Sequence, residues 1–348
     1  MNRLLLITTD FPPQTGGVAR YLGLMASYFK DRLCVISRSD ELLYRFFWPR
    51  WIKSVLLLLR QQSTYDFVIS SQLLPLGTAA LVASWFTKKP YIIIVHGMDV
   101  RLALTTRVKR ILSTFVLNHA RIVVANSKAL SREVGEAFHL ALPLVVYPCV
   151  ESLSTVSLKS TVQESMKPFV FLTVSRLISR KGHVDVLNAL AYLKQIGDLP
   201  PFEYHIVGQG PMEPSLKEVT TQLQLSEVTF YGAVSDEERE KQYALADVFV
   251  MPVTDDPVDK EGFGTVFLEA ARFAVPSVST TIQGVDEAIL HGQTGLLVSP
   301  HDHSALAQAL LTLMTSAQER TRLGNNARER VNLEFTCEKQ FAKLESYI

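Results

Sequence analysis

Short apolar runs separated by helical patterns constrain the fold of this chain most strongly. In the first 150 residues the apolar runs are Arg3–Thr8, Leu33–Ser37, Asp66–Ser70, Tyr91–Val95 and Arg121–Ala125. Runs this short, bounded by polar residues, Gly or Pro, predict buried strands of the kind found in parallel sheets. Because helical patterns lie between them, they predict an α/β domain with a parallel sheet.

The second half of the chain repeats this organisation. After a Ser/Thr-rich stretch without periodicity, the strand-like runs are Phe169–Val174, Glu203–Gly208, Val228–Val234, Asp247–Pro252, Pro276–Thr280 and Thr294–Pro300. Residues 303–348 carry only helical patterns. We therefore predict an N-terminal domain over 1–150, a linker over 151–167, a second α/β domain over 168–330 and a C-terminal helix over 331–348.

Composition and charge narrow the class of protein. Hydrophobic residues make up 47% of the chain and charged residues 20%, which predicts a well-cored globular protein. No apolar run reaches the roughly 20 residues that span a bilayer, and we read the N-terminus as a first strand rather than a signal peptide. Residues 1–150 hold 18 Lys and Arg against 8 Asp and Glu, whereas residues 151–348 hold 17 against 26. This asymmetry indicates different partners for the two domains, one of them anionic, although we expect no nucleic acid.

The three cysteines, Cys34, Cys149 and Cys337, are widely spaced and form no metal or redox motif. We expect buried thiols in a reducing, cytoplasmic location.

One basic and aromatic segment, Leu42–Arg60, contains no acidic residue. Aromatic side chains favour the bilayer interface and basic ones favour anionic lipid, so this segment predicts contact with a membrane surface. A smaller patch of the same kind spans Trp85–Lys89. The alternative is a core helix with a turn at Pro49.

The stretch Lys260–Ala270, KEGFGTVFLEA, has the strongest signature of a ligand site. Glu261 precedes two glycines, Gly262 and Gly264, and Glu269 follows within a helical pattern that opens at Thr265. Glycines let backbone N–H groups approach a ligand, and a helix start adds partial positive charge. A loop carboxylate beside such an anion site suits a ligand with phosphates and hydroxyls, such as a nucleotide sugar. A surface loop capped by an ordinary helix is the alternative.

Other candidate residues follow predicted strands, where ligands bind in parallel sheets. They are Asp10, Gly16, Gly17, His96, Asn126 and Ser127 in the first half, and Arg176, Lys181, Gly208, Gly210 and Gly232–Val234 in the second. Arg176 and Lys181 are two cations suited to a diphosphate. Ser127 is also placed to cap the next helix.

The motifs described above, together with several other stretches of the sequence and in the order in which they occur, resemble the GT-B-fold glycosyltransferases of the large retaining family 4. The resemblance covers nearly the whole chain, from FPPQTGGVARYL through IVHGMDV, VSRLISRKGHVDVL and IVGQGP to TGLLV, and Glu261 and Glu269 match the family's E-x7-E motif. The stretch FVMPVTDDPVDKEGFGTVFLEA is particularly similar to GDP-mannose-using phosphatidylinositol mannosyltransferases. The resemblance implies two Rossmann-like domains facing each other across a cleft, with the C-terminal helix packing back on the N-terminal domain.

The resemblance also implies roles for individual residues. Arg176 and Lys181 hold the donor diphosphate, Gly16 and Gly17 meet its distal phosphate, and Glu269 binds the ribose. Glu261 holds the sugar and phosphate together with the N–H groups of Phe263, Gly264 and Thr265. His96 lies beside the reacting carbon. The remaining implied donor contacts are Gly208, Gly232 and Val234 towards the nucleotide, and we place Asp10, Asn126 and Ser127 on the acceptor side.

The implied enzyme transfers a hexose, with mannose favoured, from a nucleoside diphosphate sugar to a lipid-linked or membrane-proximal glycan acceptor. We expect GDP-sugar rather than UDP-sugar, no cofactor, no metal, and a peripheral position on the inner face of the cell membrane. Asp255 and Asp256 lie in an acidic loop, which we interpret as solvated rather than metal-binding. The alternatives are a soluble enzyme acting on a small acceptor, a nucleotide-sugar epimerase, or a non-catalytic nucleotide-sugar-binding protein.

Two positions depart from the family pattern. Ala274 stands where the family usually has Gly, and Gly284 is a single glycine where many members have two. We expect both to affect local packing and to leave the ligand groups in place.

Overall fold

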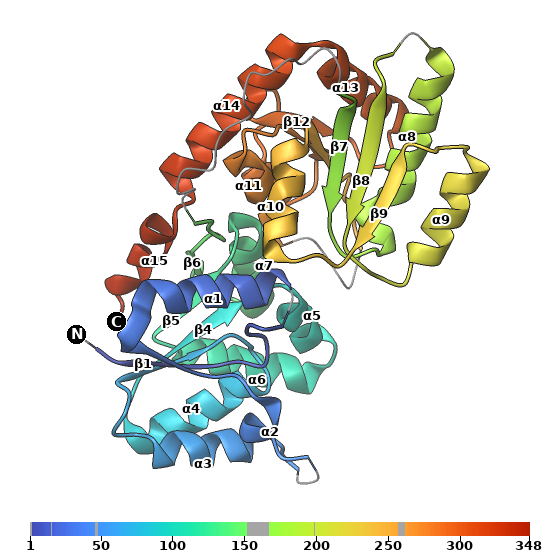
Figure 1. The fold of residues 1–348 in the computed structure, drawn as a ribbon. Helices are drawn as coiled ribbons and strands as arrows, with labels where there is room; N and C mark the ends of the chain where they lie inside the picture. Colours follow the sequence, from blue (N-terminus) through green and yellow to red (C-terminus); the bar gives the residue numbers. More distant parts are fainter. Residues whose placement is uncertain (1, 15, 46–47, 152–166, 198, 257–261) are drawn as a thin grey trace. The chain divides into compact units, whose positions relative to one another are not determined.

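The computed structural model describes residues 2–14, 16–45, 48–151, 167–197, 199–256 and 262–348. They form two compact units (Figure 1). The first comprises Met1–Glu151, Val258–Phe263 and Phe335–Ile348, and the second comprises Ser152–Pro257 and Gly264–Glu334.

The first unit is built on a parallel six-stranded sheet with strand order β2-β1-β3-β4-β5-β6. The strands are β1 (Leu4–Ile7), β2 (Leu33–Ile36), β3 (Phe67–Ser70), β4 (Tyr91–Val95), β5 (Ile122–Ala125) and β6 (Leu144–Val145). The first five were predicted. The edge strand β6 was missed: it is two residues long and lies in the apolar stretch Leu140–Tyr147, which Pro143 interrupts and which was not predicted as a strand.

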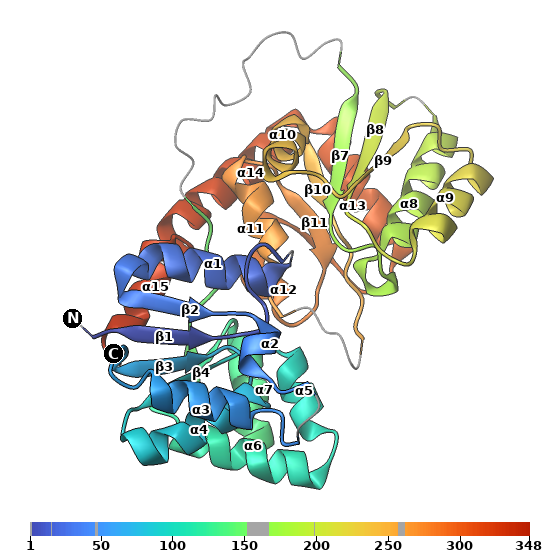
Figure 2. The same ribbon diagram turned by 60° about the horizontal axis from the view of Figure 1, so that its bottom comes forward.

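Helices cover both faces of this sheet (Figure 2). Alternate residues of β1 point to opposite faces, so Leu4 and Leu6 pack in one core while Leu5 and Ile7 pack in the other. The first core includes α1 (Gly17–Phe29) and α15 (Cys337–Glu345). The second includes α3 (Ile52–Arg60), α4 (Leu76–Thr87), α5 (Met98–Leu104), α6 (Arg107–His119) and α7 (Lys128–Phe138). The short helices η1 (Lys30–Arg32) and α2 (Ser39–Leu42) flank β2.

The C-terminal helix α15 packs on the first unit, as predicted. The ring centroids of Phe341 and Tyr21 lie 5.4 Å apart, and Arg32 forms an ion pair with Glu345 at 2.8 Å. These contacts tie residues more than 300 positions apart in the sequence, so a helix remote in the chain completes the first core.

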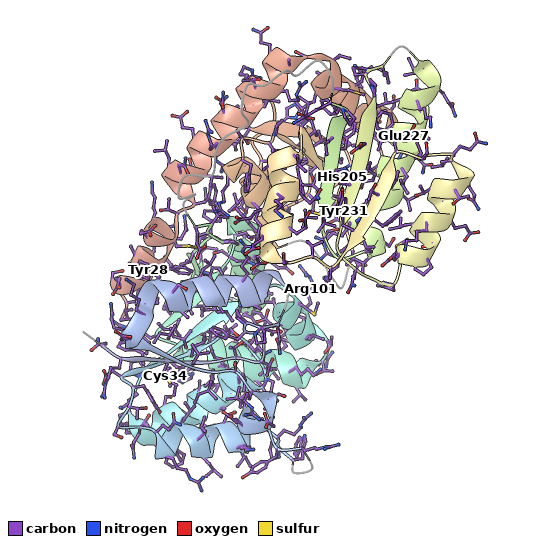
Figure 3. All side chains as sticks on the ribbon, viewed as in Figure 1. Tyr28, Cys34, Arg101, His205, Glu227 and Tyr231 are labelled. Carbon is purple, nitrogen blue, oxygen red and sulfur yellow. A yellow bond between two sulfur atoms is a disulfide. The ribbon has the colours of Figure 1, made fainter. Side chains whose placement is uncertain are left out.

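The expectation of buried thiols was wrong. Cys149 and Cys337 form a disulfide, with their Cα atoms 5.0 Å apart, and Cys34 is exposed (Figure 3). The pair is separated by 188 residues, so sequence spacing gave no hint of it. It forms where α15 returns to the first unit, next to the hydrogen bond from the Val150 N–H to the Phe335 carbonyl.

The second unit has its own parallel six-stranded sheet, with strand order β12-β11-β10-β7-β8-β9. The strands are β7 (Phe169–Val174), β8 (Phe202–Val207), β9 (Val228–Gly232), β10 (Val248–Val250), β11 (Ser277–Thr280) and β12 (Gly295–Val298). All six lie where the sequence predicted them. This is the strand order of a Rossmann sheet. All strands are parallel, and the order in which they are added reverses between β7 and β10.

Helices also cover both faces of the second sheet. On one face Phe171, Tyr204 and Ile206 share a core with α8 (His183–Ile196), α9 (Glu213–Gln222) and α13 (His303–Thr315). On the other, Phe249 packs its ring 5.9 Å from Tyr243 of α10 (Asp236–Leu245) and 5.6 Å from Phe267 of α11 (Thr265–Arg272). The remaining helical segments are η3 (Ser179–Lys181), α12 (Val285–Ala288) and α14 (Ala317–Glu334).

Within the described residues, we find no helix with the length and apolar character that crossing a membrane requires.

Candidate active site

The second unit presents its candidate groups at the carboxyl ends of β7 and β10, where the strand order reverses. Arg176 follows β7 and is exposed, whereas Lys181 at the end of η3 is only 7% exposed. Gly182 has φ 71°, and a Cβ there would overlap the carbonyl of Pro252, which follows β10. The loops after these two strands therefore touch, and they bring a buried cation to the position where parallel sheets bind ligands.

Glycines also join the loops after β7, β8 and β9. A Cβ on Gly208 would overlap the carbonyl oxygen of Ser175. The Gly208 N–H donates to the Gly232 carbonyl at 2.8 Å, and the Leu177 N–H donates to the Gln209 carbonyl at 2.9 Å. Gly208 and Gly232 thus hold the rim together through the backbone, and half-buried Val234 follows in the same rim.

His183 lies beside this rim and was missed by the sequence interpretation. Burial, together with the charge of Lys181, lowers the pKa of His183 to about 4. Its Nε2 lies 3.2 Å from the Ser175 hydroxyl. His183 is therefore neutral near pH 7, beside the positive charge of Lys181.

Helix α11 begins at Thr265, after Gly264 in the left-handed region with φ 84°. Glu269 lies on this helix about one turn in, as predicted, and is 5% exposed. The Tyr243 hydroxyl donates to Glu269 Oε2 at 3.0 Å, and Arg239 Nε lies 3.5 Å from the same oxygen. Burial disfavours the Arg239 charge, but the carboxylates of Glu269 and Asp236 outweigh it and raise the pKa of Arg239. Two residues of α10 therefore fix the carboxylate that the sequence singled out.

The rim of the first unit is polar rather than cationic. At the ends of β1 and β3, Gln72 donates to Asp10 Oδ2 at 3.1 Å and also bonds the Thr9 hydroxyl. The Ser71 hydroxyl bonds that of Thr8 at 2.6 Å. Asp10 is thus fixed at the reversal point of this sheet, between the loops after two adjacent strands.

His96 follows β4 in the same rim. Burial lowers the pKa of His96 to about 4, and its Nε2 has no hydrogen-bond partner within the described part of the chain. Asp99, which was missed, accepts the N–H groups of His96 at 3.0 Å and Leu73 at 3.3 Å. Burial still raises the pKa of Asp99 to about 6. His96 is therefore a neutral imidazole on a loop that Asp99 holds in place.

Gly262 lies next to both Asn126 and the loop that holds His96. A Cβ on Gly262 would lie 3.1 Å from Asn126 Nδ2 and 3.6 Å from the His96 carbonyl. Ser127 behaves differently, because it is buried and its hydroxyl accepts the Leu130 N–H at 3.1 Å as the cap of α7. The prediction of a capped helix is confirmed.

Four further residues were predicted as site residues. Gly16 and Gly17 form the start of α1, with Gly16 at φ 143°. The Phe263 side chain is buried, with ring centroids 5.2 Å from Tyr147 and 5.6 Å from Phe335. Glu261 lies outside the described residues.

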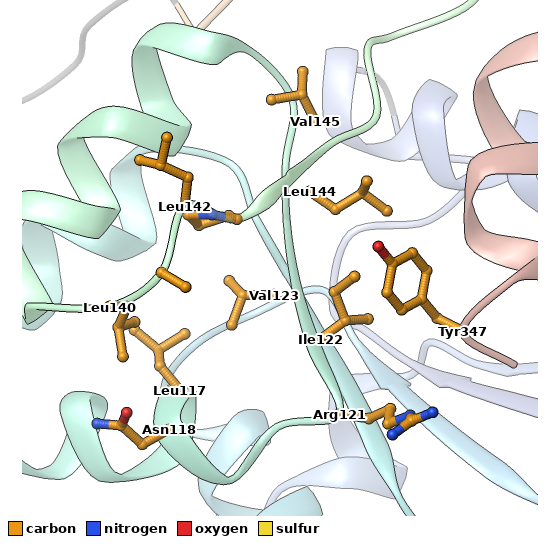
Figure 4. Close-up of a pocket in the computed structure, with 12 residues that line it drawn as sticks. Leu117, Asn118, Arg121, Ile122, Val123, Leu140, Leu142, Leu144, Val145 and Tyr347 are labelled. Carbon is orange, nitrogen blue, oxygen red and sulfur yellow. The ribbon is translucent and has the colours of Figure 1, made fainter.

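A cavity of about 530 Å³ lies elsewhere in the first unit (Figure 4). It is lined mostly by apolar side chains, among them Ile122 and Val123 of β5, with Arg121 and Tyr347. None of the predicted site residues lines it. Among the described residues we also find no group of three or more His, Cys, Asp or Glu side chains arranged to hold a metal ion.

Comparisons with known proteins identify the family. A model of the group 1 glycosyl transferases matches residues 157–330, and a model of Glycosyltransferase Family 4 matches residues 15–151. A GDP-mannose-dependent alpha-(1-6)-phosphatidylinositol monomannoside mannosyltransferase of Mycobacterium tuberculosis is 26% identical, over 100% of this chain and 98% of the relative. The D-rhamnosyltransferase WbpZ of Pseudomonas aeruginosa is 30% identical over 72% of this chain and 64% of its own length.

Solved structures agree on the fold. Anabaena Alr3699/HepE, crystallised in complex with UDP, superposes with a TM-score of 0.82 and 21% identity over 99% of this chain and 100% of that one. The lipopolysaccharide outer core galactosyltransferase WaaB superposes with a TM-score of 0.71 and 17% identity over 99% and 98%. The predicted GT-B fold is confirmed, and the chain belongs to the group 1 glycosyl transferases.

Proposed function

We propose that this glycosyltransferase is a retaining, metal-independent hexosyltransferase. Its donor is a nucleoside diphosphate hexose, with GDP-mannose favoured over UDP-sugars, and its acceptor is a lipid-linked or membrane-proximal glycan. It works without a cofactor, in the cytoplasm at the inner face of the cell membrane. The observation that carries this proposal lies in the second unit, where Lys181 is buried in the connection after β7 and Glu269 is buried on α11, the helix that follows β10.

The charges suit a diphosphate leaving group. Breaking the bond between sugar and diphosphate builds negative charge on the phosphate, and fixed cations in a partly buried site stabilise that charge. Arg176 and Lys181 supply the cations, and the first N–H groups of α11 supply a partial positive charge. These groups would stabilise the leaving phosphate as a bound metal ion does in other transferases. For this reason we propose that the reaction needs no metal.

Glu269 suits the ribose rather than the phosphate. A carboxylate accepts two hydrogen bonds from a vicinal diol, and the Tyr243 and Arg239 contacts hold one of its oxygens in place. Held this way, Glu269 does not need to be ordered when the donor binds, so less entropy is lost.

The sugar reacts with retention by attack on the same face from which the phosphate leaves. In this scheme the leaving phosphate oxygen takes the acceptor's proton, and no protein nucleophile forms a bond to the sugar. His96 contributes a neutral imidazole, which neither repels the positive charge developing on the sugar nor competes with the phosphate for cations. Glu261 positions the sugar hydroxyls and phosphate. The competing scheme, double displacement, requires Glu261 as a nucleophile below the anomeric carbon.

The mannosyltransferase named above motivates the choice of donor and acceptor, because it covers the full chain. The experiment supplies the purified protein with GDP-mannose or UDP-glucose and with a phosphatidylinositol monomannoside or free mannose, in the presence of a chelator. We expect an α-linked mannolipid whose formation the chelator does not affect. A β-linked product, or activity that the chelator abolishes, contradicts the mechanism. A changed nucleotide sugar without transfer identifies an epimerase, and binding without turnover identifies a non-catalytic protein.

A further inference from the structure

Exposed apolar side chains are concentrated in the first unit. Of the fifteen large apolar side chains exposed among the described residues, eleven belong to this unit. Single exposed apolar residues are normal on any protein, whereas a contiguous group marks an interaction surface. Helix α6 carries the largest group.

Helix α6 has two apolar faces, and in the described part of the chain one of them is buried while the other is exposed. Its residues Ser113, Val116 and Leu117 are buried in the first unit. On the outward face, Val108 and Ile111 are 76% and 70% exposed. With Leu112 and Phe115, they follow the i, i+3, i+4, i+7 spacing that places side chains in one stripe.

The stripe continues onto the neighbouring helix α4. The rings of Trp85 and Phe115 pack edge to face with centroids 6.1 Å apart, and Phe86 beside them is 69% exposed. Figures 1 and 2 both show α4 and α6 together on one side of the first unit. We call this the α4–α6 surface; it consists of Trp85, Phe86, Val108, Ile111, Leu112 and Phe115.

Basic side chains border this surface, and acids are scarce. Neither α4 nor α6 contains an acidic residue. Between residues 42 and 132 the chain has thirteen Lys and Arg against two acids, Asp66 and Asp99. Both acids are engaged, Asp66 with Arg3 and Asp99 with backbone amides. The basic residues closest in sequence to the surface are Lys88, Lys89, Arg107, Lys109 and Arg110.

We propose that the α4–α6 surface is where this enzyme binds an anionic lipid bilayer. Its Trp and Phe rings suit the interface between headgroups and acyl chains, and its basic border suits anionic headgroups. A symmetric dimer through the same surface would place two basic borders face to face, which electrostatic complementarity disfavours. The charge therefore favours a membrane over a second copy.

The proposal moves the membrane contact away from the predicted segment Leu42–Arg60. There Val55 and Leu58 of α3 are buried in the core. Trp48 and Leu56 remain as its exposed large apolar side chains among the described residues. The α4 part of the surface was predicted, as the smaller patch Trp85–Lys89, whereas the α6 stripe was missed because it contains no tryptophan.

The test compares two matched substitutions in the full-length protein by vesicle co-sedimentation, without donor or acceptor. Ile111→Glu puts a negative charge on the surface, and Ile196→Glu makes the same change on α8 of the second unit, where Ile196 is 52% exposed. Wild type is expected to bind phosphatidylglycerol-containing vesicles and to lose binding at high salt. We expect Ile111→Glu to weaken binding at least about tenfold and Ile196→Glu to leave it unchanged.

Equal binding by the Ile111→Glu variant and wild type overturns the proposal, as does binding to neutral phosphatidylcholine alone that ignores salt. Sedimentation velocity provides a second measurement. A wild-type dimer that Ile111→Glu converts to a monomer would assign the surface to a second copy instead. The proposal rests on the membrane location in the proposed function and names the surface that provides it. Vesicle binding requires no turnover, so a failure of this proposal is distinguishable from a failure of the proposed transfer reaction.

Discussion

The two units share an architecture and differ in what they present. Each is a parallel six-stranded sheet covered by helices on both faces. The first comes from the basic half of the chain, yet its rim is polar and holds a neutral His96 and the raised-pKa carboxyl of Asp99. The second comes from the acidic half, yet its rim holds Arg176 and Lys181. The net charge of a half therefore does not predict the charge of its strand-end rim, and our ligand proposal rests on the rim residues.

The two units also differ in the apolar side chains that they expose on their outer surfaces. The first unit exposes the α4–α6 surface with its basic border, while the second exposes four large apolar side chains among its described residues, of which Tyr192 and Ile196 lie one turn apart on α8. We interpret the first unit as the one that meets lipid and acceptor, and the second as the one that binds the donor. The following predictions test this division.

The largest effect is expected from Gly208→Ala in the second unit. The new Cβ would overlap the Ser175 carbonyl at φ 131°, so the loops after β7 and β8 must separate. We expect donor binding to weaken by about a hundredfold or more, since both loops shape the rim. Gly197→Ala is the matched control, because Gly197 also has a positive φ, of 75°, but nothing lies within 4 Å of its Cβ position. Titration calorimetry that finds equal affinities for both variants would contradict the role of Gly208.

A smaller effect is expected from Tyr243→Phe, which removes the hydrogen bond to Glu269 and leaves the ring packing in place. A single hydrogen bond to a carboxylate contributes about 1.5 kcal/mol, so we expect donor affinity to fall roughly tenfold. Acceptor KM should not change. Tyr192→Phe, at an exposed position on α8, is the control. A fall in acceptor affinity with unchanged donor affinity would show that Glu269 does not serve the donor.

The pH dependence of stability should also separate the units. His183 has its pKa lowered to about 4, so the unfolded state binds more protons between about pH 4 and 6.5, and stability rises with pH in that window. In the first unit, His96 acts in the same direction, but Asp99 opposes it. Because its folded pKa is raised to about 6, its contribution falls as pH rises from about 4 to 6.

We therefore expect His183→Asn to flatten the pH dependence of urea unfolding by up to about 1.4 kcal/mol per pH unit. In His96→Asn the rise of stability with pH that His96 contributes is lost, while the fall that Asp99 contributes between about pH 4 and 6 remains. A His183→Asn variant with the wild-type slope would contradict the assigned pKa.

The smallest effect is expected from Ala274→Gly, and it is a gain. Ala274 has φ 56°, a left-handed conformation that suits glycine. Replacement should stabilise the second unit by about 0.5–1 kcal/mol, seen as a rise in Tm of about 1–4 °C. Donor affinity should not change. An unchanged or lower Tm would show that the local packing, not φ, decides this position.

Much of the fold was predictable because its signals are local. Buried parallel strands appear as short apolar runs, and all the strands of the second unit were found this way. Ser127 was predicted to cap the helix that follows it, and the structure confirms this cap. Strand β6 was missed because it is only two residues long and follows Pro143, and the Cys149–Cys337 disulfide was missed because its cysteines are 188 residues apart.

The site was predictable to a similar degree. The sequence pointed to Lys181 and Glu269, which the structure buries at the end of η3 and on α11 of the same unit. It missed Tyr243 and Arg239, whose importance comes from a contact between two helices. Asp99 could have been predicted from the sequence, because it lies three residues after His96 in HGMD, next to a strand end. The α6 stripe was also readable, but an amphipathic pattern does not reveal which of two apolar faces stays uncovered.

Titration calorimetry of nucleotide sugars with wild type and Lys181→Ala tests the central claim most directly, with Lys241→Ala, an exposed position in the same unit, as the control. The account predicts that wild type binds GDP-mannose and GDP, and that Lys181→Ala weakens both by about 30-fold or more, since a charge-assisted contact to phosphate is lost. Lys241→Ala should bind as wild type does. Unchanged affinity of Lys181→Ala for both ligands would contradict the assignment of the donor phosphate site to the second unit.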